Sequence, residues 1–542
     1  MLGLLVAFLV IALGVYRPAF GGAFLSDDAH WLSQNPYVQV LSVENLVLIA
    51  RPLAEPSFAI GNYAPVALLI LGLEYQLFGT EVTGYHVVNV FLHALASALL
   101  VGVLLRSKVP AVAALLGGSF FLLHPANVEA VAWISQLKTT FSLVLGLGAV
   151  LLFSRRPALA TLLFSLALLA KPTAFVVLPF LAVWSWAHRE PPRWTWLGVW
   201  LGVLAIYSIP ELWLQQTMGI VGPPETDLGV RVRSILAFAA RYLAMAASSW
   251  GVSTYHQPEL PRSWLEPWCL AGLGLLALLG WRTVWTLRRR RVEAAWWLWA
   301  ALSFAPIAQV FPFIYPMADR YLYFILPGLI GGVILAGRDL ARSLVPAGSP
   351  LAAPLARGAA AMAVVVLAIF AVHSHQRAGI WVSGSMVFLD GASNYPNGIE
   401  GSLLRSSRAL GAGDRDQAIQ ALQAAHARGY RVLEALLEDP ALNPLRGDPR
   451  FEALIREIAT ERIERRQAKP NLSVFDVPVL AVAHFVLGQI DEGIAVLDRG
   501  EAIQGSDHPP LRARIEGLRL LAERERRRAA SAEGSVGGSV QP

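Results

Sequence analysis

Long runs of apolar residues, separated by short polar or charged segments, occupy the first 375 residues of the chain. Such runs predict membrane-spanning helices, because about 20 apolar residues cross the hydrocarbon core of a bilayer. The first run has no basic segment before it and no clean cleavage site after it, so we expect a retained span rather than a signal peptide. About eleven spans are expected, at 2–16, 86–105, 109–123, 139–154, 157–170, 172–187, 194–213, 265–281, 294–317, 321–337 and 358–374.

Basic residues cluster in alternate loops between these runs, which predicts that those loops are cytoplasmic. The clusters are Arg106 with Lys108, Arg155 with Arg156, Arg189 with Arg193, Arg288 to Arg291, and Arg338 with Arg342. The N-terminus is then expected inside the cell, and everything after residue 375 outside it. Residues 232–250, interrupted by Arg241, do not fit as a full span and are expected to form an external or re-entrant helix.

The composition changes near residue 376, where apolar residues take helical spacing among many charged ones. Two segments, which start at Gly413 and Gly488, share a Gly, a small residue, an Ile and a Leu at the same offsets. This pattern predicts tetratricopeptide-like helical hairpins over 376–525. A Gly/Ser-rich tail, 526–542, is expected to be disordered. The fold class predicted is all-α, with a polytopic transmembrane bundle over 1–375 and a soluble helical repeat domain after it.

The composition supports the membrane prediction. The 542 residues are 55% hydrophobic and only 15% charged, which excludes a disordered protein, an ordinary cytosolic enzyme and a nucleic-acid binder. The net charge of +6 lies largely in the short loops, and 17 tryptophans suit two lipid–water interfaces. Cys269 is the single cysteine, so an intrachain disulfide is excluded.

The candidate catalytic and binding residues lie in the loops that are expected on the external side of the membrane. Asp27 and Asp28 follow the first span and open a long external segment, 26–85, whose apolar stretch 64–79 is expected to lie along the interface over a cavity. Taken alone, the two carboxylates would be interpreted as a solvated helix cap or loop residues. If the interfacial stretch covers a cavity, one of the two carboxylates could act there as a general base or hold a divalent cation.

Other ionisable residues stand at the expected outer ends of spans, where such groups suggest function. Ordinary alternatives remain open: Lys171 could snorkel to the interface, and Asp319 could pair with Arg320. No spacing typical of a zinc site is present. The candidates are His124, Glu129 and Lys138 in one loop, Lys171 in the next, Tyr255 and His256 in STYHQPE, and Arg320 in MADRYLYF.

The order of these segments resembles that of bacterial multi-spanning proteins with C-terminal tetratricopeptide repeats, which are related to the animal transmembrane-and-TPR O-mannosyltransferases. The resemblance runs through most of residues 24–430. The matching segments are SDDAHWLSQNPYVQ, EYQLFG, GYHVVNVFLHAL, LLHPANVEAVAWISQLKTT, LLAKPTAFVVLPFL, ARYLAMAASSWGVSTYHQPE, MADRYLYFILPG and IWVSGSMVFLDGASNYPNG.

This resemblance implies a GT-C type glycosyltransferase, which takes a sugar from a polyprenyl-phosphate carrier on the non-cytoplasmic face. The acidic residue of the first outer loop would be catalytic, so the role falls on Asp27 or Asp28, with a modest preference for Asp28. The resemblance makes Arg320, Lys138 and Lys171 candidates for the carrier phosphate. His124 and Glu129 would line the same cavity, and Tyr255 and His256 join the substrate-binding candidates.

Two positions depart from the family pattern. Ala64 stands where a His is usual, and Thr139 stands where an acidic residue usually follows the Lys of the AWIS segment. The resemblance implies no certain cofactor; a divalent cation at Asp27 and Asp28 stays open. The expected partners are membrane lipid, the polyprenyl-phosphate sugar and a protein acceptor, and the expected location is a bacterial inner membrane.

Two other classes of protein remain: a non-enzymatic scaffold whose repeats recruit envelope proteins, and a transporter. No charged pair lies deep within a span and no clear inverted repeat is visible, which argues against the transporter. One observation separates the scaffold from the enzyme, namely whether Asp28, Lys138 and Arg320 lie together in one cavity. The scaffold function does not require them to.

Overall fold

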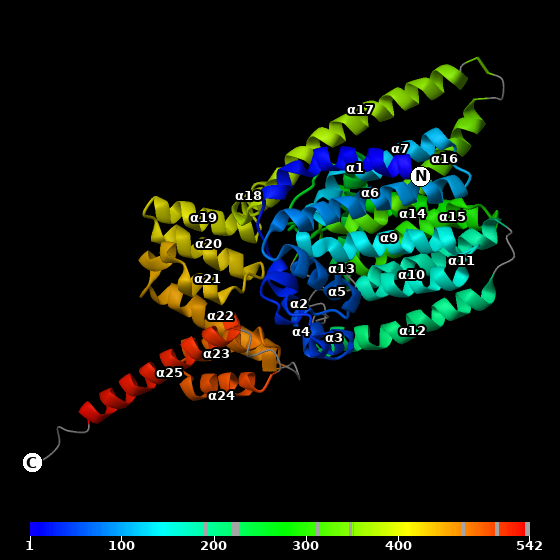
Figure 1. Ribbon diagram of the computed structural model, residues 1–542. Helices are drawn as coiled ribbons and strands as arrows, with labels where there is room; N and C mark the ends of the chain where they lie inside the picture. Colours follow the sequence, from blue (N-terminus) through cyan, green and yellow to red (C-terminus); the bar gives the residue numbers. More distant parts are fainter. Residues whose placement is uncertain are drawn as a thin grey trace, which may run out of the picture. The chain divides into compact units, whose positions relative to one another are not determined.

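A computed structural model describes residues 1–188, 193–217, 227–308, 315–345, 349–350, 352–467, 472–503 and 509–536. These residues form helices and connecting loops without a named strand, and one isolated antiparallel bridge joins His256 to Met317 (Figure 1). The predicted all-α class is therefore confirmed.

Seven helices of the described chain are long and apolar enough to cross a membrane, or eight if one bent pair counts as a single span. They are Leu2–Gly21, Val82–Arg106, Ile134–Leu152, Trp194–Gln216, Pro267–Arg288, Asp319–Leu344 and Ala352–Val382, and the bent pair is Ala111–Leu123 with Pro125–Ala132. A polytopic membrane protein is thus confirmed, whereas the count of eleven stays a prediction. Arg189 and residues 309–314 of the expected span 294–317 lie outside the described residues.

The chain divides into two compact units. The first comprises Met1–Ser33, Ala64–Pro210 and Gly222–Tyr395, and is called the membrane unit below. The second comprises Gln34–Tyr63, Glu211–Val221 and Pro396–Pro542, and is called the repeat unit. Part of the external segment predicted at 26–85 therefore belongs with the C-terminal helices.

Helices of the membrane unit pack closely where small residues allow it. In the contact between α15 and α16, a Cβ on Gly331 would lie 2.1 Å from the Trp296 ring. Such close approach is typical of helices that pack within a membrane. The helices are α1 (Leu2–Tyr16), α5 (Pro65–Phe78), α6 (Val82–Arg106), α7 (Ala111–Leu123), α8 (Val128–Ala132), α9 (Leu137–Leu152), α10 (Pro157–Ala170), α11 (Val177–His188), α12 (Trp194–Thr217), α13 (Leu228–Ser248), α14 (Pro267–Arg288), α15 (Glu293–Phe304), α16 (Leu322–Leu344), α17 (Ala352–Ala378) and α18 (Gly384–Asn394).

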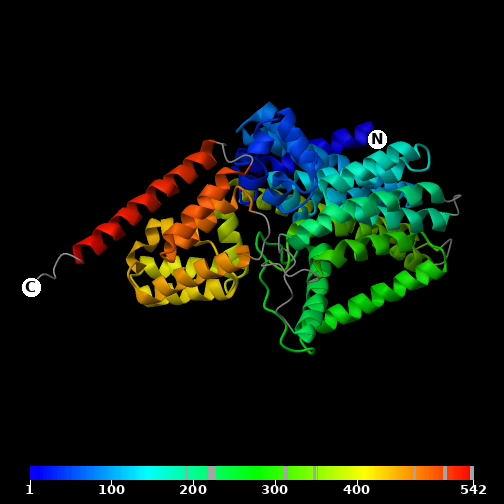
Figure 2. The same ribbon diagram turned by 90° about the horizontal axis from the view of Figure 1, so that it is seen from below.

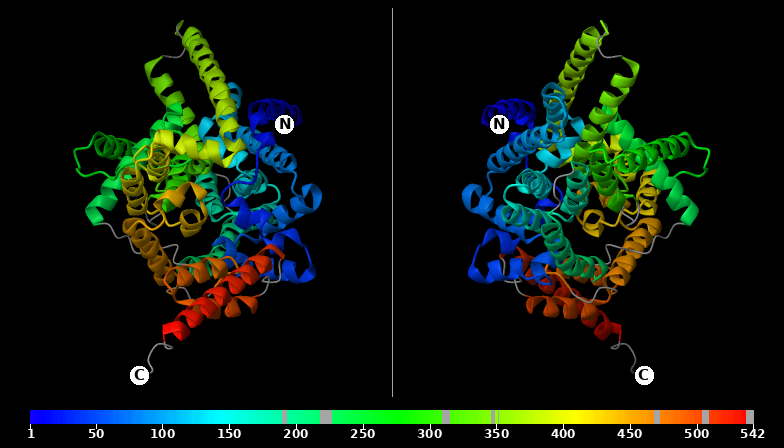
Figure 3. Two further views of the ribbon diagram at one scale, coloured as in Figure 1. Left: turned by 90° about the vertical axis from the view of Figure 1, so that its left-hand side faces the viewer. Right: turned by 90° about the vertical axis from the view of Figure 1, so that its right-hand side faces the viewer.

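A bend at His124 shapes the end of the bundle that carries the candidate residues. The residue before a proline disfavours helical backbone, so α7 ends at Leu123 ahead of Pro125. The chain then turns by 50° into a short 3-10 turn and α8. Away from this end of the unit, α16 and α17 extend beyond the neighbouring helices (Figure 3). Only 6% of the residues in the apolar stretch of α17 are buried within the protein.

The C-terminal helices of the repeat unit, α19 to α25, pack largely in sequence order (Figures 1 and 2). Gly413 and Gly488, the shared glycines of the predicted pattern, have φ of +80° and +76° at the turns before α20 and α24. Glycine adopts this left-handed backbone at little cost. The helices are α2 (Pro36–Gln39), α3 (Val43–Ala50), α4 (Glu55–Ile60), α19 (Ile399–Gly411), α20 (Arg415–Ala427), α21 (Leu433–Glu438), α22 (Pro449–Gln467), α23 (Asp476–Val486), α24 (Ile490–Glu501) and α25 (Pro509–Val536).

The structure continues α25 to Val536, past the expected start of the tail at 526. Residues 537–542 of that tail lie outside the described residues. The helical hairpins are present at both copies of the pattern, and their assignment as tetratricopeptide repeats stays a prediction.

Within the repeat unit, Glu55 of α4 joins the segment that precedes α23. Its carboxylate accepts the backbone N–H of Val474 at 2.8 Å. Burial raises the pKa of Glu55 to about 7, against opposing hydrogen bonds. The folded state therefore favours the protonated carboxyl. The stability that this gives is complete below about pH 4.5 and is lost as the pH rises through about 7.

We expect the substitution Glu55→Gln to stabilise the repeat unit at pH 8 by at most about 3 kcal/mol, with little effect at pH 5. The amide oxygen can still accept the Val474 N–H, while no charge has to be buried. The measurement is the thermal midpoint of the full chain in detergent at both pH values. Glu44→Gln, at an exposed carboxylate of α3, is the control. An unchanged pH dependence in Glu55→Gln would contradict this account.

Candidate functional site

Five charged side chains from separate segments of the membrane unit form one electrostatic cluster. Asp27 precedes the short helix at Ala29–Ser33, Glu129 lies on α8, Lys138 lies in the first turn of α9, Lys171 follows α10, and Arg320 precedes α16. Asp27 attracts both Lys138 and Arg320, and Glu129 attracts Lys171 against the repulsion of the other two cations. We call these five residues the charged cluster.

The two adjacent aspartates have different surroundings. Asp28 is buried, and its Oδ1 accepts the Ser135 N–H at 2.8 Å while its Oδ2 accepts the Leu25 N–H at 2.8 Å. Burial raises the pKa of Asp28 to about 6, although the backbone N–H groups favour the charged form. Asp28 thus braces the loop after α1 against the segment before α9.

Asp27 is exposed, and the described residues include no hydrogen-bond donor to its carboxylate. Of the two, Asp27 is thus the carboxylate free of backbone N–H bonds, while the modest preference for Asp28 as the cavity-facing catalytic residue stays a prediction. The physical reason is that the loop needs a buried acceptor for two backbone N–H groups, and the second aspartate of the pair supplies it.

Glu129 holds Arg320 in place. Its Oε2 accepts the backbone N–H of Arg320 at 2.7 Å, and its Oε1 pairs with the guanidinium. The Arg320 guanidinium also lies 5.3 Å from the centre of the Trp133 ring, and 24% of its side chain remains exposed. Arg320 is thus oriented by a carboxylate and a ring, while its side chain stays partly exposed.

The alternative pairing of Asp319 with Arg320 is wrong. Asp319 turns to the other side, where it contacts His256 Nε2 at 2.7 Å and Arg377 Nη2 at 3.6 Å. It also accepts the Ser253 N–H. The two neighbouring residues therefore serve two different groups of side chains.

Two lysines complete the cationic side of the cluster. The Lys138 Nζ lies 3.6 Å from the centre of the Trp31 ring, a cation–π contact that fixes its position. The Lys171 Nζ donates to Thr139 Oγ1 at 2.6 Å, and that hydroxyl donates to Gln136 Oε1 at 2.7 Å. Because Thr139 stands where the family pattern has an acid, Lys171 donates to a neutral partner there, and Glu129 is the carboxylate that attracts it.

The remaining candidates lie in other surroundings. Both ring nitrogens of His124 bond to backbone, Nδ1 accepting the Ala126 N–H and Nε2 contacting the Ala246 carbonyl, so His124 serves the bend after α7. His256 bonds to Asp319 and to the Tyr395 hydroxyl, and Tyr255 packs on Tyr315 with ring centres 4.9 Å apart. The structure places these three residues outside the charged cluster.

The residues at Asp27 and Asp28 fit a divalent cation poorly. Both Asp28 oxygens already accept backbone N–H groups, and Lys138 carries a positive charge beside Asp27. Carboxylate oxygens that surround the ion from several sides are the usual requirement for magnesium or calcium. No chemical step is therefore assigned to a metal here.

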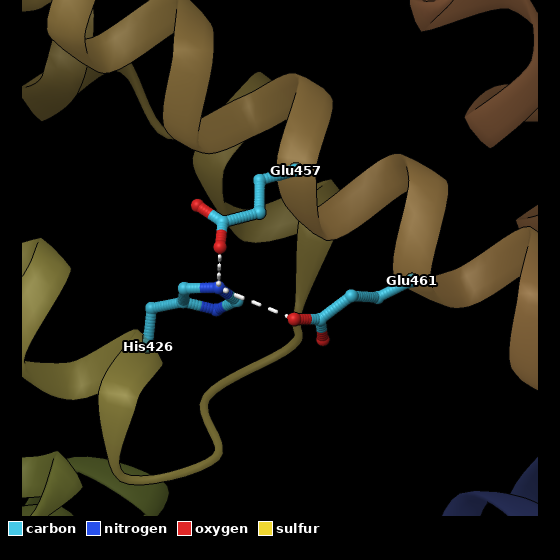
Figure 4. A group of neighbouring side chains, drawn as sticks. All are labelled: His426, Glu457 and Glu461. Carbon is cyan, nitrogen blue, oxygen red and sulfur yellow. Dashed lines mark ion pairs between the residues drawn. The ribbon is translucent and has the colours of Figure 1, made fainter.

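A His–Glu–Glu group in the repeat unit has spacing that suits a metal, but its bonds argue otherwise. His426 Nε2 lies 3.4 Å from Glu457 and 3.5 Å from Glu461 (Figure 4). Its Nδ1 receives a hydrogen bond from Arg431, so the neutral ring carries its proton on Nε2, toward the glutamates. Arg431 and Arg465 also pair with Glu461. The group is a hydrogen-bonded network that joins α20 to α22.

Trp31 and Trp133 contribute to the site but were not among the sequence candidates. Both lie within segments of the resemblance, next to the aspartates and to the AWIS lysine. The signal that could have identified them is an aromatic residue close in sequence to a charged one at the expected outer interface, where cation–π contacts are favourable.

The fold and the charged cluster define the class: an all-α polytopic membrane protein with a charged site where several helices begin or end. A protein O-mannosyl-transferase of Caenorhabditis elegans is 28% identical over 188 residues, which are 32% of this chain and 27% of that protein. Protein O-mannosyl-transferase Tmtc1 of Drosophila melanogaster is 31% identical over 183 residues, which are 31% of this chain and 21% of that protein.

These matches confirm the resemblance to the transmembrane-and-TPR O-mannosyltransferases. The chain spans about a quarter of the length of these curated relatives. No protein-family profile matches the chain, and no solved structure matches it.

Proposed function

We propose that this protein transfers a sugar from a polyprenyl-phosphate carrier to a hydroxyl group, on a protein acceptor, at the non-cytoplasmic face of the membrane. The observation that carries the proposal is the charged cluster: the exposed carboxylate of Asp27 attracts Lys138 and Arg320, and Lys171 lies near the same two cations. The names of the two matched relatives support the same reaction class.

The chemistry of this transfer needs few groups. A hydroxyl is a poor nucleophile until its proton is accepted, and Asp27 is the candidate base. The departing carrier phosphate gains negative charge in the transition state, and Arg320, Lys138 and Lys171 are the candidates to stabilise it. Since the leaving group is a phosphate, no separate general acid is required. Glu129 and Asp28 act as positioning residues through Arg320 and the loop after α1.

A transfer assay separates this proposal from the membrane scaffold. Purified full-length protein in nanodiscs is supplied with a labelled sugar on polyprenyl phosphate and with hydroxyl-bearing peptides. Label on the peptide, dependent on Asp27, supports the enzyme. Absence of transfer to every hydroxyl acceptor, together with retained binding of envelope proteins, would favour the scaffold.

The proposed topology makes a separate prediction. With the basic loops inside, the helices that follow α17 lie on the non-cytoplasmic side, where the acceptor would be met. A reporter fused after residue 400 should therefore be active only in an external compartment, and one fused after Arg156 only in the cytoplasm. Cytoplasmic activity of the first fusion would overturn both the topology and the acceptor role.

A further inference from the structure

The end of α14 and the predicted cytoplasmic loop after it carry five arginines. Two of them are neutralised by carboxylates of α15 and α16: Arg282 pairs with Glu293 at 2.7 Å and with Asp339 at 3.0 Å, and Arg291 also pairs with Asp339. The remaining three are exposed and form no ion pair with any described residue: Arg288, Arg289 and Arg290. We call these three residues the arginine surface.

Aromatic rings hold two arginines of this surface at separate places. The Arg289 guanidinium lies 4.3 Å from the centre of the Trp285 ring, on the same helix. The Arg290 guanidinium lies 5.0 Å from the centre of the Trp186 ring, on α11. An arginine held against a ring presents its donors in a fixed plane, which matches two oxygens of a phosphate. The two adjacent arginines therefore offer two phosphate positions, one at each ring.

Arg290 adopts a backbone conformation in which glycine is usual. At the end of α14, the Arg291 N–H donates to the Thr286 carbonyl at 2.9 Å, and the Arg290 N–H donates to the Leu287 carbonyl at 2.9 Å. Within this turn Arg290 has a φ of +51°. Glycine commonly ends helices in this way, because left-handed backbone is unfavourable for a residue with a side chain. An arginine here indicates a role for its guanidinium that offsets the strained backbone.

The apolar face of α14 continues directly into the arginine surface. Arg288 lies on one face of the helix together with three exposed apolar residues. They are Leu278, Trp281 and Val284, spaced three or four residues apart. Only 11% of the residues in the apolar stretch of α14 are buried within the protein. A lipid whose head group reaches the arginine surface can therefore lay its chains along the same side of the same helix.

We infer that the arginine surface binds cardiolipin, a phospholipid with two phosphate groups joined through one glycerol, and that each phosphate contacts one of the two ring-held arginines. A lipid with a single phosphate fills one position at a time, whereas two linked phosphates fill both, and the linkage raises the affinity without any new contact. General attraction between a basic loop and an anionic membrane depends on charge alone. The paired positions add a preference for the diphosphate head group. This site goes beyond the proposed transfer reaction and does not depend on it.

The test is native mass spectrometry of the full chain, released from nanodiscs of phosphatidylcholine that contain cardiolipin and twice as much phosphatidylglycerol. The two anionic lipids then supply equal numbers of phosphate groups, and wild type should retain cardiolipin in preference. Arg289→Gln combined with Arg290→Gln should lower cardiolipin retention about tenfold or more, because two surface cations are lost. Arg155→Gln combined with Arg156→Gln, at exposed positions of another basic loop, is the matched control and should retain cardiolipin as wild type does.

The variant Arg290→Gly separates lipid binding from a structural role. Glycine suits the left-handed backbone, so the thermal midpoint in detergent should stay at or above that of wild type while cardiolipin retention falls. A lower thermal midpoint with unchanged retention would show that the contact with Trp186 serves only the helix end, and would overturn the inference. Equal retention of the two anionic lipids by wild type, or equal losses in the Gln pair and the control pair, would do so as well.

Discussion

The substitution Asp27→Asn should lower sugar transfer about 10²- to 10⁴-fold while leaving the amount of folded protein unchanged. Asn keeps the size of the side chain but cannot accept the proton of the acceptor hydroxyl. The exposed position of Asp27 means that the change removes no packing and no described hydrogen bond. The measurement is the turnover of labelled donor by purified protein in nanodiscs.

Two variants complete this experiment. Glu81→Gln removes an exposed carboxylate at the start of α6 and should retain normal transfer. Asp28→Asn replaces one of two acceptors by a donor that faces a backbone N–H, so its loss of activity should follow a loss of folded protein. Normal transfer by Asp27→Asn, with a catalytic defect confined to well-folded Asp28→Asn, would return the role of base to Asp28.

Substitution of the Arg320 guanidinium group is expected to have the second largest effect on sugar transfer. Both Arg320→Ala and Arg320→Lys should lower transfer by about 10- to 100-fold, because a lysine is a point charge and cannot bind two phosphate oxygens in parallel. Arg342→Lys, at an exposed position of α16, is the control. The readout is the dependence of turnover on donor concentration.

The buried carboxylate of Glu129 complicates the alanine variant. Without Arg320 it would stay buried with no cation, which is strongly destabilising. The double variant Arg320→Ala with Glu129→Gln removes that cost and should recover the folded protein without recovering transfer. If Arg320→Lys, or the double variant, transfers sugar at the wild-type rate, Arg320 is an anchor at the interface rather than a phosphate ligand.

The positions of the charged cluster could be expected from the chain, but its contacts could not. Asp27, Lys138, Lys171 and Arg320 stand at the borders of apolar runs, and the alternation of basic loops assigns those borders to one side. That argument places residues at the same membrane depth. It cannot say which of them meet, because neighbours in a bundle are set by side-chain packing between helices far apart in sequence.

Three outcomes depended on the tertiary structure alone. Glu129 is joined to Arg320 across 191 residues, and Asp319 is joined to His256 rather than to its neighbour. The different surroundings of Asp27 and Asp28 depend on two backbone N–H groups, one of which comes from Ser135, 107 residues away. Adjacent aspartates look equivalent in a sequence, because nothing local distinguishes the acceptor that a distant segment will need.

The sequence by itself determined the all-α class, the membrane-spanning character and the change to a polar composition near residue 376. These properties follow from hydrophobicity and periodicity, which are local and additive along the chain. The tertiary structure decided which cations surround Asp27, that Gln34–Tyr63 belongs with the repeat unit, and that Arg241 faces a polar pocket. Each of these depends on contacts between distant segments, where a single buried polar group must find a partner that no local pattern specifies.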